Sequence, residues 1–192
     1  MNKYIIIIAF IVVLFFCSCT SGKKSNESAL QMEFTFDSTR VEAEYNIFET
    51  GYYFKPPAGM KYVNNQIKSL SGILQKLPFE IDSLFCNIFL NKENNSLLFL
   101  DIVKQNVNTR QEDIFKNTTM TLQSQTEFLK DDLLFHQLIF SDENNIILIL
   151  LHQNQDHIIE FHFIIPLNIY NDYSRSIESA ISTIEQKKEK IS

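Results

Sequence analysis

The chain has 192 residues, and its 17 lysines and arginines against 23 aspartates and glutamates give a formal net charge of −6. Binding to nucleic-acid phosphates needs clustered lysine and arginine, so this balance argues against a nucleic-acid partner. The 4 glycines of the chain are too few to suggest a phosphate loop, which needs several glycines at fixed spacing. We therefore expect no nucleic-acid partner and no cofactor.

The N-terminal segment has the three parts of an export signal. Lys3 supplies a positive charge, residues 4–16 are uniformly apolar, and small or polar residues occupy 17–22, as in secretory signals. The apolar run is shorter than the roughly 20 residues that a membrane-spanning helix needs. Residues 1–18 are therefore predicted to be a lipoprotein signal peptide, with an ordinary cleaved signal and an uncleaved anchor as alternatives.

Two cysteines end this segment, in the sequence Phe16-Cys17-Ser18-Cys19. It resembles the lipobox of bacterial lipoproteins, in which a small residue precedes the cysteine that is cleaved and lipidated. Ser18 makes Cys19 the preferred lipid acceptor, and Cys17 is the alternative. The resemblance implies a lipid anchor at a membrane of the bacterial cell envelope, with the domain outside the cytoplasm and an envelope protein as a candidate partner.

One globular domain is expected after the anchor. Residues 19–29 are small, polar or charged without an apolar period, which is typical of a flexible tether. Residues 30–192 contain no second linker and no internal repeat, so they are predicted to form a single domain. Cys86 would be the only cysteine left in that domain beyond the lipid acceptor. Its apolar neighbours favour a buried, unreactive thiol.

The hydrophobic pattern predicts strands and helices in mixed order. We expect strands at 33–36, 51–55, 81–90, 96–104, 133–140, 146–152 and 157–165, and a helix at 64–77. A second helix is expected to begin at the capping box Thr109–Glu112 and to bury Ile114, Phe115, Thr118 and Leu122. A closing helix is expected to bury Tyr173, Ile177, Ala180, Ile181 and Ile184. The short links between the last strands require antiparallel neighbours. The predicted fold class is α+β, an antiparallel sheet flanked by helices in an α/β/α sandwich.

Two segments resemble the Mog1/PsbP-like group of proteins. They are an early strand that ends in a proline turn, Phe54-Lys55-Pro56-Pro57-Ala58-Gly59, and a C-terminal helix near Ser176-Ile177-Glu178-Ser179-Ala180-Ile181. The resemblance covers roughly residues 45–186. It implies the fold of that group and, by analogy, a role in binding or assembly without catalysis.

Three of the four histidines form a candidate metal site. If residues 153–156 are a four-residue hairpin loop, His152 and His157 lie opposite each other. With a five-residue loop at 141–145, His136 lies opposite Leu150 on the same face. Three imidazoles in one place would suit zinc. The alternative is that His152 and His157 mark strand ends at the rim of an otherwise apolar face.

Glu160, His162 and Gln137 form a candidate ligand pocket on the other face. The same registers place Glu160 and His162 across from Ile149 and Ile147, with Gln137 in the row of Glu160. Buried polar groups must find partners. These three side chains would therefore line a pocket or bond to one another beneath a helix.

The sequence contains no serine or cysteine nucleophile motif. The adjacent carboxylates Glu112-Asp113 and Asp131-Asp132 fit a helix start and a loop rather than acid–base catalysis. We therefore expect a membrane-anchored lipoprotein whose domain binds or assembles without being an enzyme. The alternative is a metal-dependent ligand-binding protein or hydrolase that uses the histidine cluster.

Overall fold

The computed structural model describes residues 30–47, 50–63 and 87–187. The predicted signal segment with Cys17 and Cys19, the predicted tether, the predicted helix at 64–77 and Cys86 lie outside these residues. Within the described ranges, no helix is long and apolar enough to cross a membrane.

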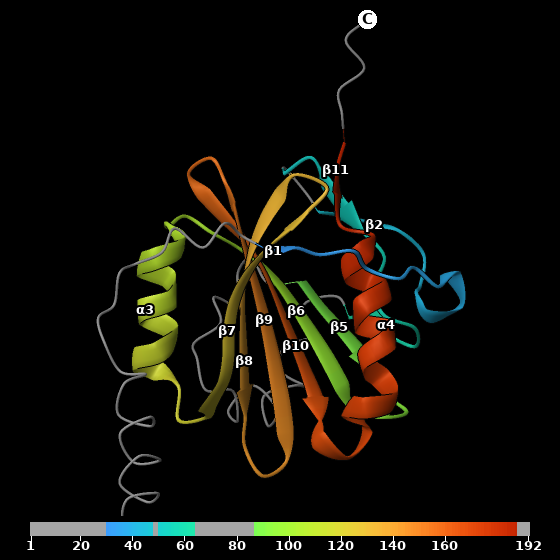
Figure 1. Ribbon diagram of the computed structural model, residues 1–192. Helices are drawn as coiled ribbons and strands as arrows, with labels where there is room; N and C mark the ends of the chain where they lie inside the picture. The colour runs from blue at the N-terminus through green and yellow to red at the C-terminus, as the bar shows by residue number, and fades with distance from the viewer. Residues whose placement is uncertain (1–29, 48–49, 64–86, 188–192) are drawn as a thin grey trace, which may run out of the picture.

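Most of the described strands belong to one eight-stranded sheet, which has the order β1-β7-β8-β9-β10-β6-β5-β4 (Figure 1). Neighbours run antiparallel except β1 and β7, which are parallel. The strands are β1 (Leu30–Gln31), β4 (Lys61–Val63), β5 (Asn87–Asn91), β6 (Ser96–Val103), β7 (Thr121–Lys130), β8 (Leu133–Ser141), β9 (Asn145–Asn154) and β10 (His157–Pro166). A three-stranded sheet has the order β11-β3-β2, with β2 (Tyr45–Ile47), β3 (Tyr52–Phe54) and β11 (Glu185–Gln186). The fold is therefore α+β with a mainly antiparallel sheet.

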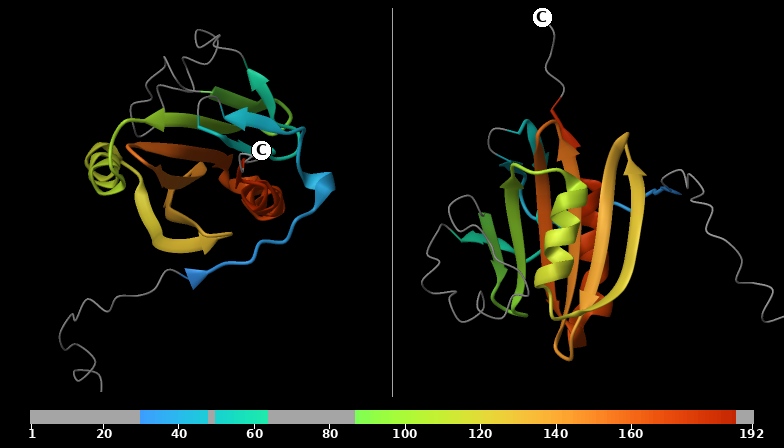
Figure 2. Two further views of the ribbon diagram at one scale, coloured as in Figure 1. Left: turned by 90° about the horizontal axis from the view of Figure 1, so that it is seen from above. Right: turned by 90° about the vertical axis from the view of Figure 1, so that its left-hand side faces the viewer.

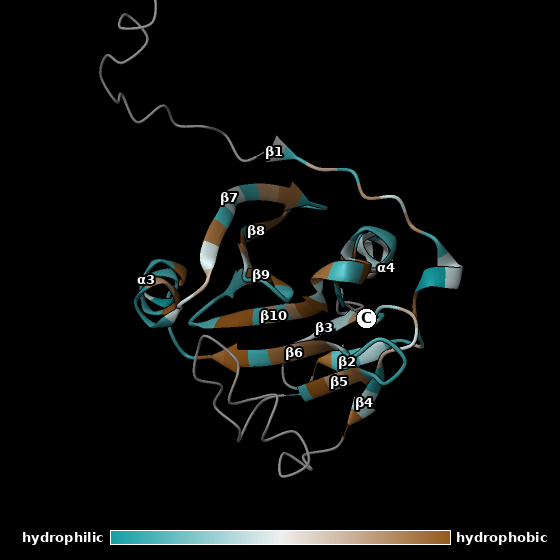
Figure 3. Ribbon diagram, turned by 90° about the horizontal axis from the view of Figure 1, so that it is seen from below, coloured by the Kyte–Doolittle hydropathy of each residue, from teal (hydrophilic) through white to brown (hydrophobic). Residues whose placement is uncertain are grey.

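The described helices pack against the large sheet through two clusters of buried apolar side chains. On β10, Phe161 and Phe163 belong to the first cluster, whereas Ile158 and Ile164 belong to the second, as the alternation of a strand requires. The helix α4 (Tyr170–Ser182) packs into the first cluster and α3 (Val107–Asn117) into the second. Figures 2 and 3 show α4 within the curve of the large sheet and α3 outside it. Short 3₁₀ helices, η1 (Ser38–Arg40) and η2 (Leu167–Ile169), complete the described elements.

Tight turns account for the antiparallel order of β7 to β10. Asp131 and Asp132 join β7 to β8 with φ of 48° and 68°, as a two-residue hairpin turn of type I′ requires. Gln155, in the turn between β9 and β10, has φ of 56°. Between β8 and β9, Oδ1 of Asp142 accepts hydrogen bonds from the N–H groups of Asn144 and Asn145, each at 2.7 Å. The predicted antiparallel run is confirmed, but its strands are longer and its loops shorter than predicted.

The predicted proline turn after β3 is joined to the closing helix. Gly59 has φ of 81°, and a Cβ atom there would lie 2.4 Å from Nδ2 of Asn91, so this position requires glycine. The hydroxyl of Tyr173 on α4 donates a hydrogen bond to the carbonyl oxygen of Ala58 at 2.9 Å. Residues far apart in sequence are thus held together at the turn.

Three element predictions were wrong. Residues 33–36 form no strand, and the first strand, β1, lies just before them. Asn106 rather than Thr109 caps α3, since Oδ1 of Asn106 accepts a hydrogen bond from the N–H of Thr109 at 3.0 Å. The helix ends at Asn117, so Leu122 lies not on its buried face but in β7, a strand that the hydrophobic pattern did not predict.

Candidate functional site

The three histidines of the predicted metal site do not meet. The turn between β9 and β10 has two residues rather than four, so His152 lies opposite Ile159 and not opposite His157. His136 lies opposite Leu151, one residue from the predicted register. A shift of one residue turns a strand's side chains to the other face, so His136 and His152 lie on opposite faces. Among the described residues, no three His, Cys, Asp or Glu side chains are grouped to hold a metal ion.

Two of these histidines instead pair with nearby carboxylates. Nδ1 of His136 lies 3.0 Å from Oε1 of Glu127 on β7. Nδ1 of His157 lies 2.6 Å from Oδ1 of Asp156, its neighbour in the chain. His157 is the first residue of β10, whereas His136 lies within β8.

The third, His152, is buried, and its hydrogen bonds define its tautomer. Its Nδ1 lies 2.9 Å from the carbonyl oxygen of Leu134. A carbonyl oxygen only accepts hydrogen bonds, so Nδ1 carries the proton. Burial lowers the pKa of His152 and favours the neutral ring, in which Nε2 accepts a hydrogen bond from the hydroxyl of Tyr52, 2.9 Å away. His152 therefore joins β9 to β8 and to the smaller sheet as a neutral imidazole.

We expect Tyr52→Phe to lower the free energy of unfolding by about 1–2 kcal/mol, because the buried Nε2 of His152 loses its donor. Burial lowers the pKa of His152 from 6.5. A lowered histidine pKa favours the neutral form in the folded state, so this contribution to stability is present above pH 6.5 and lost as the pH falls. Urea unfolding on both sides of that pH measures both effects. Tyr53→Phe, whose hydroxyl contacts the exposed Glu185, is the control, and equal losses in the two variants would contradict the prediction.

Two of the three predicted pocket residues lie together. Glu160 and His162 share the face of β10 that carries the second apolar cluster, and Nε2 of His162 lies 2.9 Å from Oε2 of Glu160. The placement of Gln137 was wrong, because it lies opposite Leu150 and therefore on the other face. The one-residue shift between β8 and β9 that displaces His136 is the cause.

Arg110 and Asp101 complete this group of buried charges, and sequence reasoning missed both. From α3, Arg110 donates two hydrogen bonds to Glu160, at 2.6 Å from Nε and 2.9 Å from Nη2. The side chain of Glu160 is fully buried, with 0% exposure, and that of Arg110 is 16% exposed. Asp101 of β6 is also buried and lies directly opposite Glu160. We call Arg110, Glu160, His162 and Asp101 the ionic cluster.

Charges within the ionic cluster shift one another's pKa values. Burial opposes ionisation of Glu160, but hydrogen bonds and charge from His162 and Arg110 outweigh it and lower the pKa of this carboxyl. Burial likewise disfavours the Arg110 cation, yet Glu160 raises the pKa of the guanidinium. For Asp101, burial dominates and raises the pKa. The ionised pair between Arg110 and Glu160 therefore ties α3 to β10.

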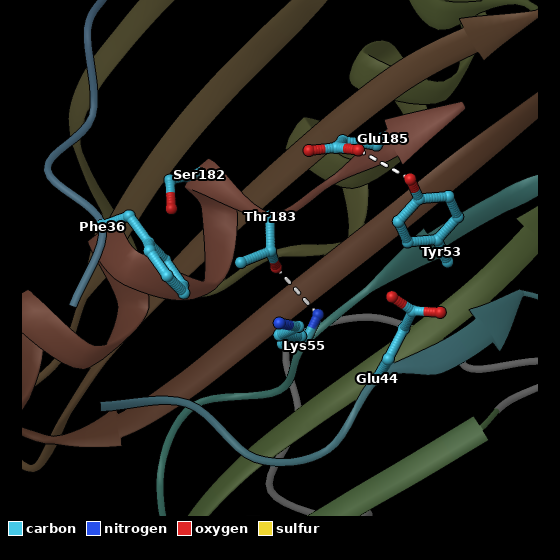
Figure 4. A pocket seen from close by; sticks show the side chains of 7 residues that line it. All are labelled: Phe36, Glu44, Tyr53, Lys55, Ser182, Thr183 and Glu185. Carbon is cyan, nitrogen blue, oxygen red and sulfur yellow. Dashed lines mark hydrogen bonds between the residues drawn. The ribbon is translucent and has the colours of Figure 1, made fainter. Parts of the chain in front are cut away.

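A cavity of about 430 Å³ lies at the C-terminal end of α4. It is bounded by the segment before η1, the residue before β2, the end of β3, the end of α4 and β11 (Figure 4). Its lining residues are Phe36, Glu44, Tyr53, Lys55, Ser182, Thr183 and Glu185. Its size falls in the lower part of the range of ligand pockets, about 300–1,000 Å³. This cavity is the candidate binding site of the described chain.

Hydrogen bonds fix the walls of the cavity. The backbone N–H of Lys55 donates to Oγ1 of Thr183 at 2.8 Å, and the hydroxyl of Tyr53 donates to Oε2 of Glu185 at 2.6 Å. The bond to Glu185, with a smaller contribution from the charge of Glu44, raises the pKa of Tyr53. The carboxylates of Glu185 and Glu44 therefore both disfavour ionisation of the Tyr53 hydroxyl in the cavity.

Comparison with solved structures relates this arrangement to a known fold. The solution structure of cyanobacterial PsbP (CyanoP) from Synechocystis sp. PCC 6803 matches with a TM-score of 0.52 and 12% identity, covering 77% of this chain and 93% of that one. The domain has a PsbP-like fold. A crystal structure from Bacteroides thetaiotaomicron VPI-5482 covers 76% of this chain and 48% of its own at 14% identity, and its TM-score of 0.37 supports no inference. No protein-family description and no curated protein matches the chain.

The cavity of the PsbP-like domain was not predicted from the sequence. Tyr53 and Lys55 adjoin the proline turn that carries the resemblance, but Ser182 and Thr183 come from the far end of the closing helix. A sequence-level signal exists in Thr183, a polar residue beside the apolar stripe of α4. It accepts the N–H of Lys55 across 128 residues of chain. The hydrogen bond between Lys55 and Thr183 can be identified only once the fold is known.

Proposed function

We propose that the protein is a lipoprotein of the bacterial cell envelope, lipid-anchored to a membrane with its domain outside the cytoplasm. The observation that carries this proposal is the N-terminal sequence, in which Lys3, the apolar residues 4–16 and Ser18-Cys19 occur in the order of a lipoprotein signal. Each buried methylene of an acyl chain contributes about 0.8 kcal/mol to membrane binding, and two or more chains make attachment stable. Residues 1–18 would be removed, and residues 19–29 would be the tether.

The anchored domain, residues 30–192, is proposed to bind or assemble without catalysis. The PsbP-like fold is compatible with this role, and the complete domain is proposed to be an α/β/α sandwich with helices on both faces of the sheet. The cavity beside α4 offers a binding site of small-molecule size. A histidine-dependent metal hydrolase, the alternative, gains no support from the described residues, because His136 and His152 lie on opposite faces of the sheet.

We expect Cys19→Ser to abolish lipid attachment. The full chain, expressed in a bacterial host with labelled palmitate, should incorporate label and sediment with membranes, whereas the Cys19→Ser chain should carry no label and leave the membrane fraction. Cys17→Ser is the matched control and should behave like the unaltered chain. Label that persists in Cys19→Ser but disappears in Cys17→Ser would move the acceptor to Cys17. An unmodified N-terminus in every chain would refute the anchor.

A further inference from the structure

The charged groups that line the cavity beside α4 are not paired with one another. The ammonium group of Lys55 lies 5.6 Å from the centroid of the Phe36 ring, and no ion pair within the described residues joins it to Glu44 or Glu185. Glu185 uses one carboxylate oxygen to accept the hydroxyl of Tyr53. One cavity therefore holds an ammonium group and two carboxylates that keep capacity for further hydrogen bonds.

Opposite charges occupy different parts of the cavity wall. Figure 4 shows Phe36 on one side of the cavity, Tyr53 and Glu185 on the other, and Thr183 and Lys55 between them. Glu44 lies near Tyr53 in the same view, and its charge acts on the Tyr53 hydroxyl. The cavity thus has an acidic end beside the ring of Tyr53, and the ammonium group of Lys55 lies toward the ring of Phe36.

The two ends are held apart by the fold. β11 pairs with β3, so Glu185 lies opposite Tyr53, and the N–H of Lys187 donates to the carbonyl oxygen of Gly51 at 2.7 Å. On the other side, Thr183 accepts the backbone N–H of Lys55. Because the main chain beneath both charged ends is hydrogen-bonded, a ligand would not have to order it, and preorganisation of this kind favours binding.

We propose that this cavity binds a small zwitterion, in which a primary ammonium group is joined through a short chain to a carboxylate or phosphate. The ammonium group lies between Glu44 and the second carboxylate oxygen of Glu185, beside the ring of Tyr53. The anionic group contacts the ammonium of Lys55. Two charge-assisted hydrogen-bonding ends make the pair of charges the feature that is recognised. This inference rests on the proposed binding role of the domain but not on its lipid anchor.

Two sources supply this chemistry in a cell envelope, and both are testable. A free zwitterion such as an amino acid carries it in solution, and a phosphoethanolamine headgroup carries it on a lipid. The probes are β-alanine and 2-aminoethyl phosphate, titrated into the full chain in non-ionic detergent and followed by calorimetry. Ethylamine, propionate and ethyl phosphate are the controls, because each keeps only one of the two charges.

At least one zwitterion should bind tenfold or more tightly than either of its singly charged controls. Lys55→Gln and Glu44→Gln should each weaken binding at least fivefold, and Lys92→Gln, an exposed lysine in the β5–β6 turn, should leave it unchanged. Thermal unfolding of each variant checks that the fold is kept. Mixed micelles of detergent and phosphatidylethanolamine that displace the probe, where micelles with phosphatidylglycerol do not, identify a headgroup. Failure of both kinds of lipid to displace it identifies a free ligand.

Three results would overturn the proposal. They are the absence of binding by both zwitterions, equal binding by a zwitterion and its singly charged controls, and a loss of binding in only one of Lys55→Gln and Glu44→Gln. The lipid anchor is tested separately. A lipidated chain that binds no zwitterion refutes the site alone, whereas an unlipidated chain that binds one refutes the anchor alone.

Discussion

Replacing Arg110 with methionine should lower the free energy of unfolding by about 3–5 kcal/mol, because it leaves the carboxylate of Glu160 buried without the guanidinium group that pairs with it. Methionine keeps much of the arginine stem, so the loss reports on charge more than on volume. Glu160 has 0% side-chain exposure and receives two hydrogen bonds from Arg110. Equilibrium unfolding in urea at neutral pH measures the change.

Two further variants separate this charge effect from a general weakening of α3. Lys116→Met alters an exposed ion pair with Glu112 on the same helix and should change the free energy of unfolding by about 0.5 kcal/mol or less. The double variant Arg110→Met/Glu160→Leu removes both buried charges and should recover most of the loss. A loss in Arg110→Met no greater than in Lys116→Met would contradict the assignment of the ionic cluster as the link between α3 and β10.

The effect of Arg110→Met should also depend on pH. The pKa of Glu160 is lowered from 4.5 in the folded state, so its contribution to stability is present above pH 4.5 and is lost as the pH falls through the folded-state pKa. The effect of Asp101 on stability has the opposite sign. Its pKa is raised in the folded state, so protonation at low pH removes the free-energy cost of burying its charge. The difference between the unaltered chain and Arg110→Met should therefore shrink on acidification as Glu160 becomes neutral in both.

Truncating Phe161 to alanine should lower the free energy of unfolding by about 3–5 kcal/mol, because it opens a cavity in the first apolar cluster. Phe161 has 0% exposure. Its ring lies edge-on to Phe54 of β3, with centroids 5.3 Å apart, and is stacked on Phe163 at 6.5 Å. The residue therefore connects the central strand β10 to the smaller sheet, and its loss should weaken the contact between the two sheets.

Leu167→Ala is the matched control for Phe161→Ala, because Leu167 is 46% exposed in η2 at the end of β10. Its effect should stay near 0.5 kcal/mol, as for most surface substitutions. Phe161→Leu, which keeps most of the apolar volume, should lie between the two. If Phe161→Ala and Leu167→Ala unfold at the same urea concentration, the first cluster does not depend on this ring.

Much of the sheet was predictable because its central strands carry a clear apolar pattern. β8, β9 and β10 are dense in isoleucine, leucine and phenylalanine between polar turns, and the closing helix has an apolar stripe of period 3.6. β7 was missed because it lies near the edge of the sheet. Of its residues, only Phe128 and Lys130 are buried, so its sequence lacks the alternation by which strands are recognised.

The lengths of the β8–β9 and β9–β10 turns explain which polar residues were predicted on the correct face of the sheet. The β9–β10 turn was two residues shorter than predicted, an even shift that leaves side chains on their faces, so Glu160 and His162 were placed on the correct side of β10. The pairing of β8 with β9 was shifted by one residue, an odd shift that moved His136 and Gln137 to the wrong faces. The composition of a loop indicates a turn but does not determine how many residues the turn contains.

By itself the sequence determined the α+β class, the antiparallel run at the end of the chain and the PsbP-like resemblance, because periodicity and turn residues are local properties. The proposal of a lipid anchor rests on the sequence alone, since Cys19 and the segment before it lie outside the described residues. Only the tertiary structure decided that Arg110 meets Glu160 and that Lys55 meets Thr183. These contacts join residues 50 and 128 positions apart, and no local pattern encodes which distant elements will pack together.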